Sequence, residues 1–142
     1  MKKSNLSESN HGLWILISKL SHSILLARQK ELNPYHIPVR QYQVLRTIYD
    51  LGSKATVCEV AKRIEREPHT ISRQTVMLVK DGLLERTRNI PKSKLLKLEL
   101  TKKGLNMIKA AKRSKSVDAR FSLLSWEERQ QLESILKKLL IE

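Results

Sequence analysis

The clearest structural signals in the chain lie in residues 56–104, TVCEVAKRIEREPHTISRQTVMLVKDGLLERTRNIPKSKLLKLELTKKG. It opens with Thr56, whose hydroxyl can cap a helix, and then repeats apolar residues at spacings of three and four. The repeating residues are Val57, Val60, Ala61 and Ile64. This spacing predicts a short helix with one buried side, followed by a polar turn at 65–67.

A second helix is predicted to begin at Pro68, because proline lacks an N–H group that the first helical position does not use. Gly82 can adopt the left-handed conformation that ends such a helix. The apolar side carries Ile71, Thr75, Leu78 and Val79, and the opposite side carries His69, Thr70, Ser72, Arg73 and Gln74. Two helices in this order predict a helix-turn-helix, whose second helix enters the major groove of DNA.

The polar side chains of this second helix suit DNA. Arginine pairs with guanine and glutamine with adenine through two hydrogen bonds each, so Arg73 and Gln74 are candidates for reading bases. Thr70, Ser72 and the free N–H groups of the first turn suit phosphate oxygens. A polar helix face is also typical of simple exposure to solvent. The sequence that follows the helix favours DNA binding.

Residues 84–89 and 96–100 are strand-like, and the second segment alternates apolar and charged residues. From Arg86 to Lys115 there are 11 basic residues against the single acidic residue Glu99. A basic hairpin beside a polar helix is predicted to lie along phosphates and reach into a minor groove. The predicted fold is therefore mostly α with a small antiparallel β-wing, a winged helix-turn-helix.

In this order of elements the chain resembles the MarR-type (multiple antibiotic resistance regulator) transcription factors. The resemblance is carried by residues 59–64 (EVAKRI), 70–73 (TISR), 80–86 (KDGLLER) and 100–104 (LTKKG). It implies a homodimer that binds a palindromic operator and is often released from it by a small ligand or an oxidant. We expect a single domain over 1–142, with a helical dimerisation region at 10–32 and 101–142 and a DNA-binding region at 38–100.

The expected DNA-binding residues are Thr56, Pro68, His69, Thr70, Ser72, Arg73, Gln74, Arg88, Lys92 and Lys94. The family's wing usually carries an Asp two residues before an Arg, where this chain has Lys92 and Lys94. That Asp normally forms an ion pair with basic groups of the wing or recognition helix, so its absence predicts a less tightly held wing tip. Lys94 also fits a narrow minor groove less well than Arg does. The resemblance places ligands between the dimerisation helices and the DNA-binding region. The candidates there are His22, His36 and Tyr42, each of which could instead be a core or interface residue.

The segments outside the DNA-binding region are predicted to be helical. Residues 10–32 and 38–51 carry apolar residues at helical spacing, Thr101 caps a long helix to about Phe121, and Ser125–Glu128 form a capping box before a final helix. One short chain offers too little surface to bury the apolar sides of both the first and the last helix. We expect them to pair with a second copy, placing two recognition helices about 34–36 Å apart. The alternative is a monomer whose termini pack together.

Length and charge limit the number of domains and the class of partner. The chain has 142 residues and a net charge of +14, so one domain with an anionic partner is expected, although charge alone does not separate DNA from RNA or a membrane surface. There is no apolar run of about 20 residues and no signal-peptide core. We expect a cytoplasmic protein. Its single cysteine, Cys58, is interpreted as a small structural residue rather than an oxidant sensor.

The sequence contains no enzymatic motif, so catalysis and a cofactor are not expected. The four histidines lack the spacing of metal ligands, so a bound metal is not expected either. The function predicted is sequence-specific binding of double-stranded DNA by a homodimeric transcriptional repressor. Two alternatives stay open. One is a sequence-independent, architectural nucleic-acid binder that uses the same basic face. The other is a winged helix that binds an acidic protein partner.

Overall fold

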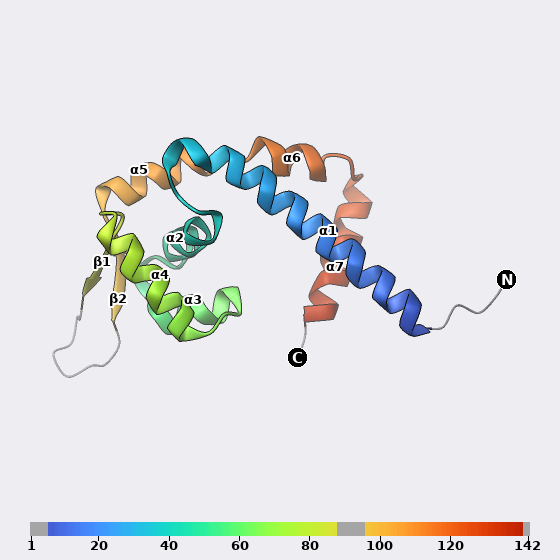
Figure 1. Cartoon of the computed structure of the whole chain (residues 1–142), viewed down its shortest axis with the longest axis horizontal. Helices are drawn as coiled ribbons and strands as arrows, with labels where there is room; N and C mark the ends of the chain where they lie inside the picture. The colour runs from blue at the N-terminus through green and yellow to red at the C-terminus, as the bar shows by residue number, and fades with distance from the viewer. Residues whose placement is uncertain (1–5, 88–95, 141–142) are drawn as a thin grey trace. The chain divides into compact units, whose positions relative to one another are not determined.

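The computed structural model describes residues 6–87 and 96–140 (Figure 1). Two compact units are distinguished. One is formed by residues 29–113, and the other by the helical segments that precede and follow them. The predicted fold class is confirmed, since the described chain is mostly helical and contains a two-stranded antiparallel sheet.

The unit of residues 29–113 begins with the last turn of the long helix α1 (Leu6–Leu32). Its further elements are the 3-10 turn η1 (Asn33–Tyr35), α2 (Val39–Leu51), the 3-10 turn η2 (Gly52–Lys54), α3 (Val57–Ile64), α4 (Pro68–Lys80), β1 (Leu84–Thr87), β2 (Lys97–Leu100) and α5 (Lys102–Ala111). Helix α2 lies at the centre and packs against α3, α4, α5 and β2. Its residues Leu45 and Ile48 are buried with Ile71, Leu78, Leu98 and Ile108. Burying each such side chain contributes roughly 1.5–3 kcal/mol, which fixes α4 on the core.

Local signals set the boundaries of α3 and α4 as predicted. The Thr56 hydroxyl accepts a hydrogen bond from the Glu59 N–H at 3.1 Å and caps α3. Glu65 ends α3 in the left-handed conformation, with φ of 58°. Pro68 is the first residue of α4, and Gly82 follows the helix with φ of 76°. Helices α3 and α4, with the turn of residues 65–67 between them, form the helix-turn-helix.

The wing strands β1 and β2 pair antiparallel, from Leu84 opposite Leu100 to Thr87 opposite Lys97. The Leu98 N–H donates to the Ala55 carbonyl at 2.9 Å, so β2 is also tied to the residues just before α3. The predicted wing contacts Arg88, Lys92 and Lys94 lie outside the described residues.

The start of α5 is bonded to the end of α4. The Thr101 hydroxyl donates to the Gly82 carbonyl at 2.6 Å, and the Lys103 ammonium donates to the Asp81 carbonyl at 2.9 Å. The same Thr101 hydroxyl accepts from the Gly104 N–H, as the predicted cap of α5. A Cβ atom on Gly104 would overlap the Leu83 carbonyl oxygen. Glycine therefore permits the close approach between these two segments.

The predicted single helix from Thr101 to Phe121 is wrong. The structure has two helices there, α5 and α6 (Lys115–Phe121), because the Ser114 hydroxyl accepts from the Val117 N–H and starts a new helix. The predicted capping box before α7 (Trp126–Leu140) is confirmed. The Glu128 N–H donates to the Ser125 hydroxyl at 3.1 Å, and the Ser125 N–H donates to the Glu128 carboxylate at 2.9 Å.

The second unit contains most of α1 together with α6 and α7. Large apolar side chains on α1 and α7 are exposed within the single chain. On α1 they include Leu13, Trp14, Leu16 and Ile17, and on α7 they include Trp126, Ile135, Leu136, Leu139 and Leu140. None of the described helices is long and apolar enough to cross a membrane.

Candidate nucleic-acid interface

The side of α4 that faces away from the core carries the centre of the predicted site. Ile71, Thr75 and Leu78 are buried, whereas Pro68, His69 and Arg73 are exposed. His69 and Arg73 are separated by one helical turn and lie on the same side of α4. The Glu67 side chain makes no capping hydrogen bond at the start of α4. The arrangement presents one guanidinium and one imidazole on an accessible helix face.

Thr70 and Gln74 lie on the flank of α4 that faces α2. Both line a small groove, of about 40 Å³, whose apolar lining is Val44, Ile64 and Ile71. The Gln74 Oε1 atom is buried and has no hydrogen-bond partner among the described residues. Leaving such an acceptor unpaired costs roughly 1–3 kcal/mol. Gln74 therefore lies at the edge of the exposed helix face, and its amide oxygen must turn outward to meet a ligand.

The same groove brings in three residues that sequence reasoning missed. Arg40 and Gln43 come from α2, and Arg66 comes from the turn between α3 and α4. Arg40 and Arg66 are exposed, so two guanidinium groups border the flank of α4. Arginine forks suit phosphate oxygens, which accept two parallel hydrogen bonds. Residues separated this far along the chain share no local motif, so only the packing of α2 on α4 reveals them.

Two other predicted contacts already have bonds within the protein. Thr56 is half-buried, and its hydroxyl accepts the Glu59 N–H as the cap of α3. Ser72 is half-buried, and its backbone carbonyl, not its side chain, accepts a hydrogen bond from the Thr75 hydroxyl at 2.7 Å. Both hydroxyl groups can still donate a hydrogen bond to a phosphate.

Cys58 and Val79, which both belong to the helix-turn-helix, are exposed. Cys58 lies on the exposed side of α3, away from the buried Val60 and Ala61, and its interpretation as a small structural residue stays a prediction. Val79 retains 39% of its surface exposed, although the spacing placed it with Ile71 and Leu78. The buried side of α4 is narrower than the apolar pattern suggests.

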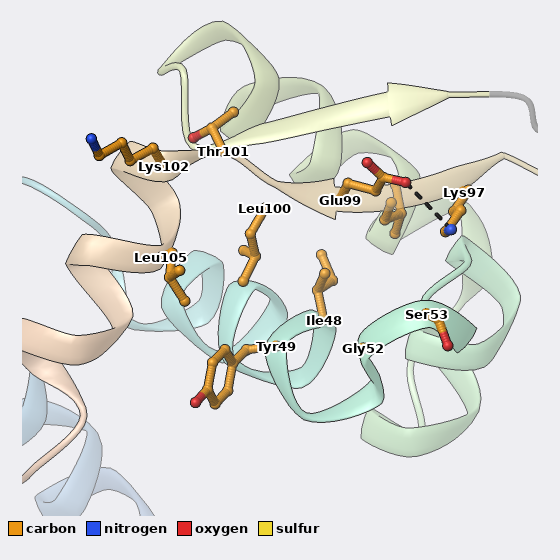
Figure 2. A pocket seen from close by; sticks show the side chains of 11 residues that line it. Ile48, Tyr49, Gly52, Ser53, Lys97, Glu99, Leu100, Thr101, Lys102 and Leu105 are labelled. Atoms are coloured by element: carbon orange, nitrogen blue, oxygen red, sulfur yellow. Dashed lines mark ion pairs between the residues drawn. The ribbon is translucent and has the colours of Figure 1, made fainter.

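A larger groove of about 510 Å³ lies elsewhere in the same unit, between α2, β2 and the start of α5 (Figure 2). Its apolar lining includes Ile48, Leu98, Leu100 and Leu105, with the ring of Tyr49 at one side. Lys97 and Glu99 form an ion pair at its edge, with 3.4 Å between nitrogen and oxygen. None of the predicted DNA contacts lines this groove.

The structure does not gather the three candidate ligand residues into one described cavity. His22 is exposed on α1, in the helical unit. His36 is exposed and ends η1 in the left-handed conformation, with φ of 55°. Tyr42 is buried in the core of the unit of residues 29–113, with 5% of its surface exposed. Among the residues that the structure describes, no group of three or more His, Cys, Asp or Glu could hold a metal ion.

Comparisons with known proteins agree with this geometry. Residues 37–90 match the model of the MarR family. The organohalide-sensing RdhR transcriptional regulator, solved with 2,4-dichlorophenol bound, is 26% identical and has a TM-score of 0.82 over 98% of this chain and 85% of that one. A cysteine-to-serine mutant of E. coli MarR, solved with operator DNA, is 25% identical and has a TM-score of 0.82 over 97% of this chain and 100% of that one.

The S. aureus MepR–DNA complex shares the fold, with 23% identity and a TM-score of 0.81 over 90% of this chain and 95% of that one. No curated protein matches the chain significantly.

Proposed function

We infer from the MarR-type winged helix of this chain that it is a transcriptional regulator that binds double-stranded DNA in a sequence-specific way. The observation that carries the proposal is the arrangement around α4. Arg73 and His69 are accessible on its outer side, and Arg40 and Arg66 border its flank. Base edges are read in the major groove and phosphates on either side of it, so one docked helix serves both sets of contacts.

In this proposal each group has a separate role. Arg73 donates two hydrogen bonds to a guanine, and the Gln74 side chain turns its amide outward from the groove to pair with an adenine. Arg40 and Arg66 hold the neighbouring phosphates. The predicted wing residues Arg88, Lys92 and Lys94 add contacts to a minor groove. The net charge of +14 supports the electrostatic part of the affinity.

The experiment that tests the proposal measures binding to the DNA upstream of the protein's own and neighbouring genes, in competition with random duplex at physiological salt. We expect protection of a two-fold site and a preference of about 10³ or more over random DNA. Equal competition by random duplex would leave the architectural nucleic-acid binder as the better description. Tight binding to an acidic protein with only weak DNA affinity would favour the protein-interaction module.

We also propose that the protein acts as a homodimer on a palindromic operator and represses transcription by occluding a promoter. The exposed apolar side chains of α1 and α7 support the dimer, because a second copy would remove them from water. Two copies related by a two-fold axis require two half-sites related in the same way. Transcription in vitro from the protected promoter, with and without the protein, measures the direction of regulation.

A small ligand is proposed to release the protein from DNA. The support is the apolar groove of Figure 2, whose volume of about 510 Å³ falls within the range of ligand sites, and the dichlorophenol held by the similar RdhR regulator. A titration with 2,4-dichlorophenol, followed by amide shifts in NMR spectra, would locate binding. Saturable shifts at Gly52, Ser53 and Thr101 are expected, and their absence would remove this groove as the site.

A further inference from the structure

Helix α4 exposes apolar as well as polar side chains on the side that faces away from the core. Val76 retains 52% and Met77 51% of their surfaces exposed. At helical spacings of three and four, Val76 falls in one row with His69, Arg73 and Lys80. The row is exposed along its whole length. An accessible valine thus stands between two cationic side chains on the outer side of α4.

The two apolar residues have different surroundings. The Met77 sulfur accepts a hydrogen bond from the Gln41 amide of α2 at 3.4 Å, so Met77 is held toward α2. Val76 belongs neither to the buried core nor to the partly buried residues that pack against it. An exposed β-branched residue also lowers helix propensity slightly. Packing within the described chain therefore gives no reason for valine at this position.

The neighbours of Val76 identify the surface that would cover it. Arg73 and Lys80 flank it with positive charge, which favours a polyanion over an apolar protein surface. Within the major groove, the apolar group that a base edge presents is the 5-methyl group of thymine. A short branched side chain on the outer row of a docked helix can contact such a methyl group and exclude water from it.

We propose that Val76 is a specificity-determining residue that contacts the 5-methyl group of a thymine in each operator half-site. The inference rests on the proposed DNA-binding function and adds the chemical group that is read. Arg73 supplies hydrogen bonds to a base, and Val76 supplies an apolar contact one turn further along α4. Together they select a thymine at a fixed distance from the base that Arg73 reads.

The test begins with selection of the preferred duplex from a random pool, followed by replacement of each thymine of a half-site by deoxyuridine. This change removes only the methyl group and keeps base pairing. At one position, wild-type protein should bind the deoxyuridine duplex about fourfold more weakly, the value expected for one buried methyl group. Val76→Ala should weaken binding to the thymine duplex by a similar factor and no longer distinguish the two duplexes.

Val79→Ala is the matched control, since it makes the same substitution on the same helix at a residue outside the row of His69, Arg73, Val76 and Lys80. It should distinguish the two duplexes as wild type does. Equal binding of wild type to thymine and deoxyuridine at every position would overturn the inference while the proposed function stands. A deoxyuridine effect that persists in Val76→Ala would overturn the assignment to Val76. Failure to select any preferred duplex would overturn the proposed function and this inference with it.

Discussion

Arg73 is the residue on which the base preference is expected to depend most. It is exposed on the second turn of α4, on the side opposite the buried Ile71 and Thr75. Arg73→Ala should weaken operator binding by about 1–3 kcal/mol, because a two-pronged contact to guanine is lost. Base preference should relax at one position in each half-site. Titration of single-base operator variants against wild type and Arg73→Ala measures both effects.

Arg63→Ala provides the control, since Arg63 is exposed on α3 and lines no described groove beside α4. It should leave the base preference unchanged. If Arg73→Ala lost equal affinity for operator and random duplex, Arg73 would be a phosphate contact and another residue would have to read the guanine.

Arg66 is expected to act differently, through the phosphate backbone. It borders the groove on the flank of α4 together with Arg40. Arg66→Ala should weaken operator and random duplex alike and reduce the slope of log affinity against log salt by about one unit for each half-site. Affinity measured between about 50 and 200 mM salt gives the slope. Arg129→Ala, on α7, is the control. An unchanged slope in Arg66→Ala would remove Arg66 from the phosphate contacts.

At the scale of elements, the joint between α4, the wing and α5 is the feature most sensitive to a single methyl group. Gly104→Ala would place a Cβ atom onto the Leu83 carbonyl oxygen, which belongs to rigid backbone. We expect the substitution to lower the free energy of unfolding by about 1–3 kcal/mol, the usual cost of overpacking. Urea denaturation followed by circular dichroism measures this change.

Gly12→Ala is the matched control, because a Cβ there meets no heavy atom within 4 Å. Gly12 lies inside α1, where alanine favours the helix by about 0.8–1 kcal/mol over glycine. The same substitution should thus have opposite signs at the two glycines. Equal effects would mean that the approach of α5 to Leu83 is not tight in solution.

The elements differ in how far the sequence predicts them, and the reason is the range of the interactions that form them. The bounds of α3 and α4 follow from adjacent signals, namely the Thr56 cap, Pro68 and Gly82. The break between α5 and α6 also has a local cause in Ser114, but the apolar pattern that continues across it concealed the cap.

The candidate site likewise contains residues placed by local helical spacing and residues placed by packing between helices. The exposed face of α4 follows from helical spacing, which placed His69 and Arg73 opposite the buried residues. The groove that joins Gln74 with Arg40 and Arg66 depends on how α2 packs on α4, and no spacing within one segment encodes it. Val79 was misplaced because the packed side of α4 is narrower than its apolar pattern suggests.

For the whole molecule, the exposed apolar side chains of α7 predict the oligomeric state. Leu136 and Leu139 retain 40% and 66% of their surfaces exposed in the single chain. In a monomer Leu139→Glu would be a surface change worth within about 0.5 kcal/mol. In the proposed dimer it would bury an unpaired carboxylate, so we expect Leu139→Glu to dissociate the protein at micromolar concentration. Light scattering coupled to gel filtration measures the mass.

The proposed dimer also determines how this change should affect DNA binding. Two recognition helices held in one particle bind two half-sites with a high effective concentration for the second contact. Leu139→Glu should therefore lose affinity for the two-fold operator but keep the weak affinity for an isolated half-site. Ser134→Glu adds the same charge on the opposite side of α7 and should change neither mass nor affinity. A Leu139→Glu variant that remains a dimer would place the two-fold contact away from this face of α7.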